Sequence, residues 1–223
     1  MAPCIFFDMD GVLIDSEPVW EEAVDRVFGE LGIVLDAALK AHTAGMGNEE
    51  SVRLVLSQHP SVGADVSAIC NRIDDVVLDG IASGVGVMPG ANGLLSELAG
   101  RGVPLALVST SAPVLIQAVV QANGWGDLFR LTLSSEEVGP GKPDPAVYRE
   151  AARRMGADVE RSVAIEDTVN GARSAHGAGL RVIGFTRDPV VAAAMREWVW
   201  QVAKDFAEVR RMLLDSGIVP VDG

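Results

Sequence analysis

Acidic side chains, hydroxyls and one lysine occur at the points where short apolar runs of the sequence end. In chain order, these side chains are Asp8, Asp10, Ser109, Thr110, Ser111, Lys142, Glu166 and Asp167. In an open parallel sheet, ligands bind at the carboxyl ends of the strands, which lie along one edge. We therefore expect these side chains to converge on one site at that edge.

The four carboxylates of this set indicate a bound cation. Isolated carboxylates held so close together repel one another, and their pKa values rise. A hard cation with oxygen ligands removes this conflict, and Mg²⁺ with a phosphate substrate fits the set best. The two cysteines, Cys4 and Cys70, and three scattered histidines offer no cluster of soft ligands. We therefore expect two buried free thiols and no zinc site.

The segment Asp8–Glu17, which begins Asp-Met-Asp-Gly, closely resembles the first motif of the haloacid dehalogenase-like phosphatases. Ser109 matches the second motif of that family, Lys142 the third, and the pair Glu166-Asp167 the fourth. Order and spacing agree, and the resemblance extends over nearly the whole chain. A single Asp-x-Asp-Gly is usually a turn, so the combination of four motifs carries the resemblance.

The resemblance implies a phosphomonoester hydrolase that works through an aspartyl-phosphate. Asp8 would be the nucleophile, and Asp10 would protonate the departing alcohol and then deprotonate the attacking water. Ser109 and Thr110 would bind phosphoryl oxygens. Lys142 would hold both the phosphate and Asp8, which stabilises charge in the transition state.

The family also binds Mg²⁺, and the resemblance carries its ligands over to this chain. They would be the carboxylate of Asp8, the backbone carbonyl of Asp10 and the carboxylate of Asp167. Glu166 would either bind the ion directly or hold in place a residue that binds it, and the sequence leaves both alternatives open.

Within the family, Ser16-Glu17-Pro18 and the helical region after it resemble the branch with a small helical cap. That branch includes sugar-phosphate phosphatases, phosphoglycolate phosphatases and β-phosphoglucomutases. Such mutases carry a histidine where this chain has Trp20, an arginine near Asn48, and a Lys-Asn pair at Ala112-Pro113. Without these groups the chain lacks the charge to grip a second phosphate, which favours hydrolysis of small phosphates, sugar phosphates among them.

Three other functions compete with this one. A β-phosphoglucomutase-like phosphotransferase is the first alternative, and a non-catalytic relative that binds phosphometabolites is the second. The four intact motifs speak against the second. A dehalogenase is not expected, because that branch lacks the acid that Asp10 supplies.

The elements around these motifs predict an α/β fold with a Rossmann-like parallel sheet. Short apolar runs alternate with helical patterns, and each expected strand is almost continuously apolar, as strands covered on both faces are. The expected strands are Cys4–Phe7, Val103–Val108, Leu128–Leu133, Ser162–Ile165, Arg181–Phe185 and an edge strand Trp198–Val202. The expected core helices are Ala112–Ala122, Asp144–Met155, Thr168–Gly177 and Phe206–Leu214.

Residues 16–88 break this alternation and are expected to form an inserted all-helical cap domain. Apolar residues recur there at helical spacing, first from Trp20 to Leu31 and again from Val66 to Ile81. Residues 1–15 and 89–223 would then form the catalytic core. Pro89 and Gly90 mark the expected return hinge.

Composition limits the partners. The chain has 223 residues, of which 48% are hydrophobic and 22% charged, with a formal net charge of −13. This balance is typical of a soluble globular protein, and the negative charge opposes binding to nucleic acid or anionic membranes. We expect a monomer whose partner is a small phosphate ester. The N-terminus has no basic lead and only a short apolar run, which predicts a cytoplasmic location.

Overall fold

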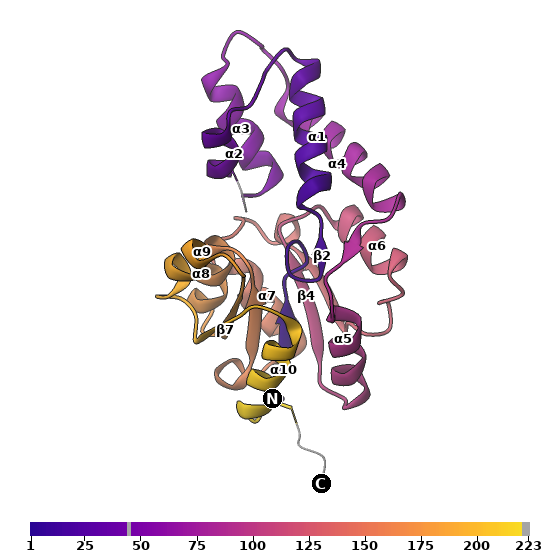
Figure 1. Ribbon diagram of the computed structural model, residues 1–223, viewed down its shortest axis with the longest axis vertical. Helices are drawn as coiled ribbons and strands as arrows, with labels where there is room; N and C mark the ends of the chain where they lie inside the picture. The colour runs from indigo at the N-terminus through magenta and orange to yellow at the C-terminus, as the bar shows by residue number, and fades with distance from the viewer. Residues whose placement is uncertain (44–45, 220–223) are drawn as a thin grey trace.

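Six parallel strands form a sheet in the order β5-β4-β1-β6-β7-β8 (Figure 1). The computed structural model describes residues 1–43 and 46–219. In sheet order, the strands are β5 (Leu131–Ser134), β4 (Leu105–Ser109), β1 (Ile5–Phe7), β6 (Val163–Glu166), β7 (Arg181–Phe185) and β8 (Gln201–Ala203). The α/β architecture with a parallel sheet is therefore confirmed.

The central strand β1 is apolar on both faces because helices cover both sides of the sheet. Ile5 and Phe7 belong to one hydrophobic cluster, with residues of α5, α6 and α10. Cys4 and Phe6 point the other way, into a second cluster with residues of α7, α8 and α9. This alternation follows from the two-residue period of a strand. The helices are α5 (Ala91–Gly100), α6 (Pro113–Ala122), α7 (Ala146–Met155), α8 (Val169–Gly177), α9 (Pro189–Met195) and α10 (Phe206–Asp215), with 3-10 turns η1 (Ser135–Glu137) and η2 (Val159–Arg161).

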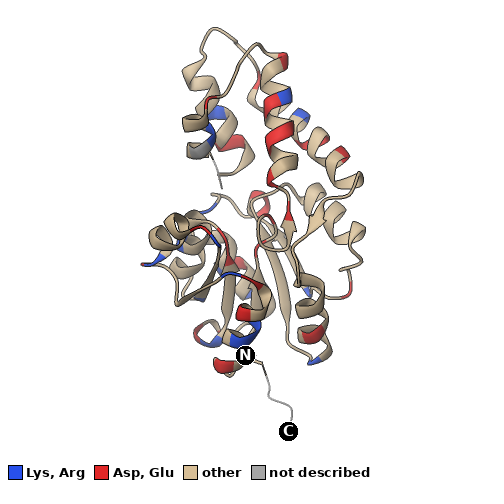
Figure 2. Cartoon of the chain, in the orientation of Figure 1, with Lys and Arg blue, Asp and Glu red and all other residues tan. Residues whose placement is uncertain are grey.

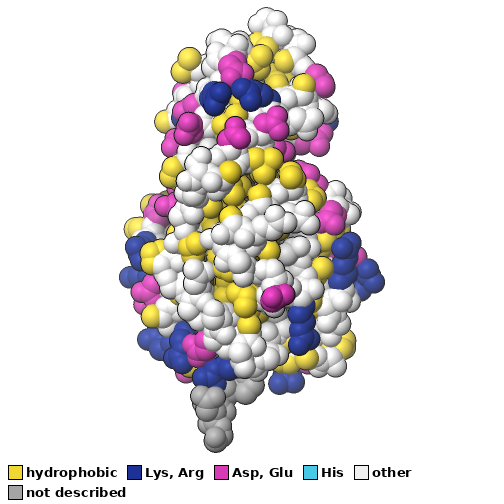
Figure 3. All heavy atoms as spheres, turned by 90° about the vertical axis from the view of Figure 1, so that its right-hand side faces the viewer, with side chains coloured by type: hydrophobic (Ala, Val, Ile, Leu, Met, Phe, Trp, Pro, Cys, Tyr) yellow, Lys and Arg dark blue, Asp and Glu magenta, His cyan; other side chains and the backbone are white. Residues whose placement is uncertain are grey.

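A group of helices is inserted after β1 and forms the upper part of the molecule in Figure 1. Its buried residues recur at three- and four-residue spacing, as in Ile69, Ile73, Val76 and Val77 of α4. Helix α4 packs against α1 and α3, and it also contacts α6 of the core. Figure 3 views the molecule from the right-hand side of Figure 1 and shows apolar side chains gathered where the insertion meets the core. The helices are α1 (Glu17–Glu30), α2 (Ala37–Thr43), α3 (Asn48–Gln58) and α4 (Val66–Ala82).

Two short strands connect this insertion to the core, and the sequence did not predict them. β2 (Ile14–Asp15) and β3 (Gly86–Val87) pair antiparallel, with Ile14 opposite Val87. Two-residue strands are too short to show an alternating pattern. The inserted helical cap is confirmed as an architecture, whereas its boundaries at residues 16 and 88 stay a prediction.

Most other differences from the expected elements are small. β8 is shorter than expected because Trp198 and Trp200 belong to the turn before it, where the Trp200 N–H donates to Val182 O at 2.8 Å. Helices α5 and α9 were not predicted. Both cysteines are free, as expected, but only Cys4 is buried, whereas Cys70 is half-buried on α4. Among the described residues, no helix has both the length and the apolar character to cross a bilayer.

Candidate active site

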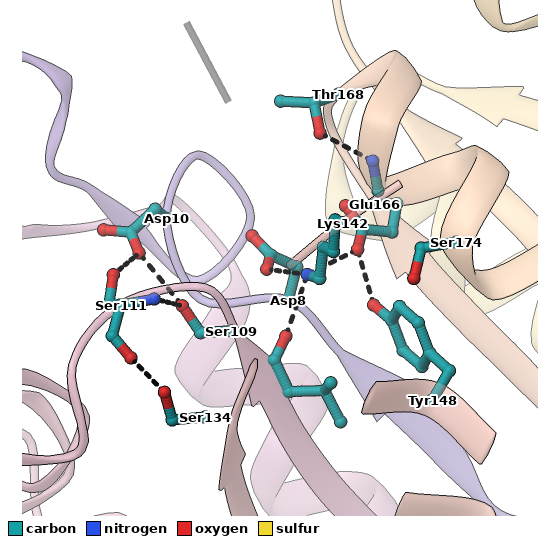
Figure 4. A network of polar contacts seen from close by, with 12 residues as sticks. Asp8, Asp10, Ser109, Ser111, Ser134, Lys142, Tyr148, Glu166, Thr168 and Ser174 are labelled. Atoms are coloured by element: carbon teal, nitrogen blue, oxygen red, sulfur yellow. Dashed lines mark hydrogen bonds and ion pairs between the residues drawn. The ribbon is translucent and has the colours of Figure 1, made fainter. Parts of the chain in front are cut away.

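Three neighbouring strands bring the predicted side chains together at the carboxyl edge of the sheet. Asp8 directly follows β1, Ser109 ends β4, and Glu166 ends β6, and these strands are adjacent. The backbone N–H of Asp8 donates to Ile165 O at 3.0 Å, which fixes the chain just past the strand. Lys142 arrives from the loop before α7. Figure 4 shows its ammonium group directed at Asp8 and Glu166.

Lys142 occupies the centre of a buried polar cluster. Its Nζ lies 2.5 Å from Asp8 Oδ1 and 2.7 Å from Glu166 Oε1, and it donates to the Val108 carbonyl at 3.1 Å. The hydroxyl of Tyr148, on α7, donates to the same Glu166 oxygen at 2.5 Å. Only 3% of Lys142 is exposed, and Glu166 is fully buried. The lysine therefore holds two carboxylates that are largely shielded from solvent.

Burial and crowding disfavour the charged forms of the acids. Burial raises the pKa of Asp8 above its usual range; Lys142 opposes this rise, and the charges of Glu166 and Asp10 add to it. Burial, followed by the charges of Asp8 and Glu166, likewise raises the pKa of Asp167. Burial alone would lower the pKa of Lys142, but the two carboxylates beside it reverse the direction and raise it. One lysine is thus too little positive charge for this cluster.

The acidic cluster has the chemistry of a Mg²⁺ site. Carboxylate oxygens of Asp8, Glu166 and Asp167 lie within 4.8 Å of one another, and Mg²⁺ prefers oxygen ligands. Glu166 Oε2 is buried without a hydrogen-bond partner. Gly11, with φ +75°, leaves room for Asp167, because a Cβ at this position would lie 2.0 Å from Asp167 Oδ2. The residues therefore fit the ion. The Asp10 carbonyl stays a predicted ligand.

The Asp10 carboxylate accepts four hydrogen bonds, two on each oxygen. Ser16 Oγ donates to Oδ1 at 2.5 Å, and the indole Nε1 of Trp20 donates to the same oxygen at 3.2 Å. Ser111 Oγ and Ser109 Oγ lie 2.7 and 3.3 Å from Oδ2. Asp10 therefore sits where the core loops meet the first inserted helix.

The loop after β4 supplies hydroxyls beside the two aspartates. Ser109 Oγ accepts from the Ser111 N–H at 3.0 Å, and Ser134 Oγ donates to the Ser111 carbonyl at 2.8 Å (Figure 4). Thr110 is half-buried in the bend between the two serines. The structure thus places Ser109 and Thr110 at the predicted edge, while their role in phosphate binding stays a prediction.

Two polar residues near the site serve helix starts. Thr168 caps α8, since its Oγ1 accepts from the Gly171 N–H at 3.1 Å. Asp144, the first residue of the predicted helix Asp144–Met155, lies just before α7. Its Oδ1 accepts from the Ala146 N–H at 2.8 Å, but the N-cap position itself belongs to Pro145.

Three residues contact the predicted site that the sequence did not assign to it: Ser16, Trp20 and Tyr148. Trp20 belongs to an apolar helical stripe. This pattern predicts that its ring packs in the core and gives no information about its N–H group. Ser111 was expected at this edge but without a stated role, and the structure gives it a hydrogen bond to Asp10. Tyr148 is the only tyrosine in the chain and lies six residues after Lys142. This closeness in sequence to Lys142 was the one feature that could have assigned it to the site.

The inserted helices place acids and an amide across from the core loop after β5. Asn48 Nδ2, at the start of α3, donates to Asp74 Oδ1 at 2.9 Å and to the Cys70 carbonyl at 3.2 Å. Burial raises the pKa of Asp74 to about 6; the Asn48 hydrogen bond opposes the rise, and the charge of Glu136 adds to it. Glu136 lies in η1, so the insertion and the core present like charges to each other here.

Comparisons with known proteins agree on one family. A family model described as haloacid dehalogenase-like hydrolase matches residues 2–179. Bifunctional riboflavin kinase/FMN phosphatase of Arabidopsis thaliana is 28% identical over 192 residues, which are 85% of this chain and 50% of that enzyme. The chain thus spans about half the length of this relative. Hexitol phosphatase B of Escherichia coli is 29% identical over 178 residues, 79% of this chain and 80% of that enzyme.

A solved structure shows the same likeness in three dimensions. The crystal structure of CbbY from Rhodobacter sphaeroides in complex with phosphate superimposes with a TM-score of 0.79 at 27% identity. The match covers 94% of this chain and 96% of that one. The family model thus identifies the hydrolase family, and the structure comparison shows the same architecture.

Proposed function

Because the chain belongs to the haloacid dehalogenase-like hydrolases, we propose that it is a Mg²⁺-dependent phosphomonoesterase. Its substrates would be small phosphorylated metabolites, sugar phosphates above all. The observation that carries this proposal is the buried Asp8–Lys142 pair with Asp10 two residues further along, at one sheet edge. The named phosphatases among the relatives support the same reaction class.

In the first half-reaction, an Asp8 carboxylate oxygen attacks the phosphorus of the ester. The bond from phosphorus to the alcohol oxygen breaks as the aspartyl-phosphate forms. Asp10 gives its proton to that oxygen, so the alcohol leaves neutral. Lys142, 2.5 Å from Asp8 Oδ1, holds the nucleophile and stabilises the charge that builds up during transfer.

In the second half-reaction, Asp10 takes a proton from water, and the water oxygen attacks phosphorus. The bond to Asp8 breaks, inorganic phosphate leaves, and the starting carboxylate is restored. Ser109 and the neighbouring N–H groups hold phosphoryl oxygens in both steps. Bound to Asp8, Asp167 and Glu166, Mg²⁺ would offset the negative charge that these acids and the phosphate bring together.

The polar groups where the insertion meets the core loop after β5 favour a neutral, hydroxyl-rich leaving group. Both N–H bonds of the Asn48 amide are used within the insertion, on Asp74 and Cys70. The groups that this junction could offer a substrate are therefore acceptors: the Asn48 carbonyl and the carboxylates of Asp74 and, from the core, Glu136. Acceptors bind sugar hydroxyls, whereas they repel a second phosphate or a carboxylate. This charge pattern also argues against a bisphosphate-binding mutase.

The proposal is tested by phosphate release from p-nitrophenyl phosphate and a panel of sugar phosphates with Mg²⁺. We expect Asp8→Asn to lower kcat at least about 10³-fold, because it removes the nucleophile while keeping its shape. Mass spectrometry of rapidly quenched wild-type protein should find the phosphoryl group on Asp8. Wild-type protein without turnover, or an active Asp8→Asn variant, would reject the function. Isomerisation of β-glucose 1-phosphate faster than its hydrolysis would establish the mutase instead.

A further inference from the structure

All the N–H groups of the Lys142 ammonium are engaged within the protein. The ammonium carries three donors, and three acceptors surround it: Asp8 Oδ1 at 2.5 Å, Glu166 Oε1 at 2.7 Å and the Val108 carbonyl at 3.1 Å. To bind a phosphoryl oxygen as well, Lys142 must turn one N–H away from one of these acceptors. The released acceptor then needs another donor, because leaving a buried polar group unpaired is destabilising.

Of the three acceptors, Glu166 already has a second donor. The Tyr148 hydroxyl donates to Glu166 Oε1 at 2.5 Å, so this oxygen stays hydrogen-bonded when Lys142 turns away. Asp8 and the Val108 carbonyl differ, because among the described residues Lys142 is the side chain that donates to each of them. Glu166 is therefore the acceptor that Lys142 can release with the least loss of hydrogen bonding.

Packing holds the Tyr148 hydroxyl in place beside Glu166. The side chain of Tyr148 is fully buried, and its ring meets Phe6 of β1 edge-on, with 6.3 Å between the ring centroids. On the other side of the carboxylate, Gly171 lies in the first turn of α8, where a Cβ would come 1.8 Å from Glu166 Oε2. Glu166 therefore lies between α8 and the hydroxyl, and both neighbours belong to helices of the core.

We propose that Tyr148 is a positioning residue for phosphate binding. Its hydroxyl keeps Glu166 Oε1 hydrogen-bonded while Lys142 turns one N–H from that oxygen to a phosphoryl oxygen. The lysine keeps its contact with Asp8 and meets the phosphate without leaving Glu166 unpaired. The inference rests on the proposed function, from which it takes the contact between Lys142 and phosphate. Tyr148 itself touches neither the phosphate nor the reacting atoms.

A tyrosine that served packing alone would give a different result on substitution. Phenylalanine keeps the ring against Phe6 and beside Lys142, whose Nζ lies 5.2 Å from the ring centroid, and removes only the hydroxyl. Both roles lower the stability of the variant, so thermal unfolding does not separate them. The affinity for phosphate does, because only the proposed role links the hydroxyl to the hydrogen bonds of Lys142.

The experiment titrates wild type and Tyr148→Phe with inorganic phosphate in a calorimeter at saturating Mg²⁺. We expect the Kd of phosphate to rise about 10-fold in the variant, because a hydrogen bond to a charged group contributes at least this factor. The value of kcat/KM for p-nitrophenyl phosphate should fall by a similar factor. Doubling the Mg²⁺ concentration should leave the change in Kd as it is, which separates the effect from weaker binding of the metal.

Ser162→Ala is the matched control for the loss of a buried hydroxyl. Ser162 precedes β6, at the end of the strand away from Glu166, and its Oγ donates to the Asp158 carbonyl at 2.6 Å. We expect this variant to have a lower Tm and the phosphate affinity of the wild type.

A second measurement needs no change of the side chain's hydrogen bonds. Tyr148 is the only tyrosine of the chain, so growth on 3-fluorotyrosine places a single ¹⁹F label on its ring. We expect saturating phosphate to shift the ¹⁹F resonance, because Lys142 then leaves the oxygen that the hydroxyl shares with it. This result is obtained even if Tyr148→Phe does not fold.

The role of Tyr148 is overturned by an unmoved ¹⁹F resonance, by an unchanged Kd in Tyr148→Phe, or by a loss of affinity that Ser162→Ala shares or that more Mg²⁺ restores. Failure of the proposed function is a separate result, in which the wild type neither hydrolyses p-nitrophenyl phosphate nor binds phosphate. Turnover by the wild type with an unaltered Tyr148→Phe would leave the phosphatase standing and remove only this inference.

Discussion

Lys142 keeps two buried carboxylates of the site from facing each other without a counter-charge. It contacts Asp8, Glu166 and the Val108 carbonyl, and no other lysine of the chain is buried. A buried ion pair contributes little compared with an apolar replacement of both partners, but removing one partner alone costs several kcal/mol. The stability of the metal-free protein therefore depends on this side chain.

We predict that Lys142→Met lowers the free energy of unfolding by about 3–5 kcal/mol near pH 8. Lys142 lowers the pKa of Asp8, so its loss raises that pKa further above the unfolded value. The folded variant then holds more protons than the unfolded chain, and its stability falls as pH rises. The deficit should shrink toward pH 5.5. Urea unfolding in EDTA measures it, with exposed Lys204→Met as the control. A deficit equal at both pH values would contradict this account.

The elements differ in how clearly the sequence specifies them. The buried strands are predictable because both faces of the sheet are covered, so their runs are continuously apolar. β2 and β3 carry no such signal. Helix α5 contains Gly93 and ends at Gly100, and glycines weaken a helical pattern. Its start at Gly90 was interpreted as part of a hinge.

The sequence predicted which residues at the strand ends form the site, but not which side chains contact one another there. Asp8, Ser109 and Glu166 are found together because parallel strands end at one edge. Which hydroxyl turns toward Asp10 depends on the bend after β4, and no sequence pattern encodes that bend. Trp20 could not be found, because periodicity places its ring on the buried face and says nothing of its N–H group.

Gly90 and Gly93 belong to the same helix, and alanine is expected to have opposite effects on stability at the two positions. Gly90, at the N-cap of α5, has φ +93°, and a Cβ there would lie 3.2 Å from Phe206 Cβ. Gly93 lies inside the helix, and a Cβ there would meet nothing within 4 Å. We predict that Gly90→Ala destabilises the fold by about 1–2 kcal/mol, whereas Gly93→Ala stabilises it by about 0.5–1 kcal/mol.

Thermal unfolding of the two variants and the wild type checks this pair. The Tm of Gly90→Ala should fall and that of Gly93→Ala should rise. An unchanged Tm for Gly90→Ala would mean that the left-handed turn is not required at the junction of insertion and core. In that case a hinge at Pro89 and Gly90, still a prediction, could be tested by turnover of the same variant.

The protein has a large net negative charge, and acidic side chains lie both on the insertion and on the core where the two meet. The formal net charge is −13, and Figure 2 shows acidic side chains along α1 and where the insertion meets the core. Much of the positive charge lies at the far end of the core, near the N-terminus. Glu136 and Asp74 approach closely enough for one to raise the pKa of the other. An anionic substrate therefore approaches against the field of the protein.

We predict that kcat/KM rises with ionic strength, by about two- to fivefold between low salt and ~150 mM NaCl. Over this range the screening length falls from ~30 Å at 0.01 M to about 8 Å, so salt weakens the long-range repulsion more than the short contacts of the bound ester. Initial rates on p-nitrophenyl phosphate at fixed free Mg²⁺ measure the effect. Glu136→Gln should reduce the salt dependence. Glu197 is exposed before β8, the outermost strand on the side of the sheet away from β5. Glu197→Gln should leave the salt dependence unchanged. A fall of kcat/KM with salt would mean that Lys142 and the metal ion, rather than the net charge, govern the approach of the substrate.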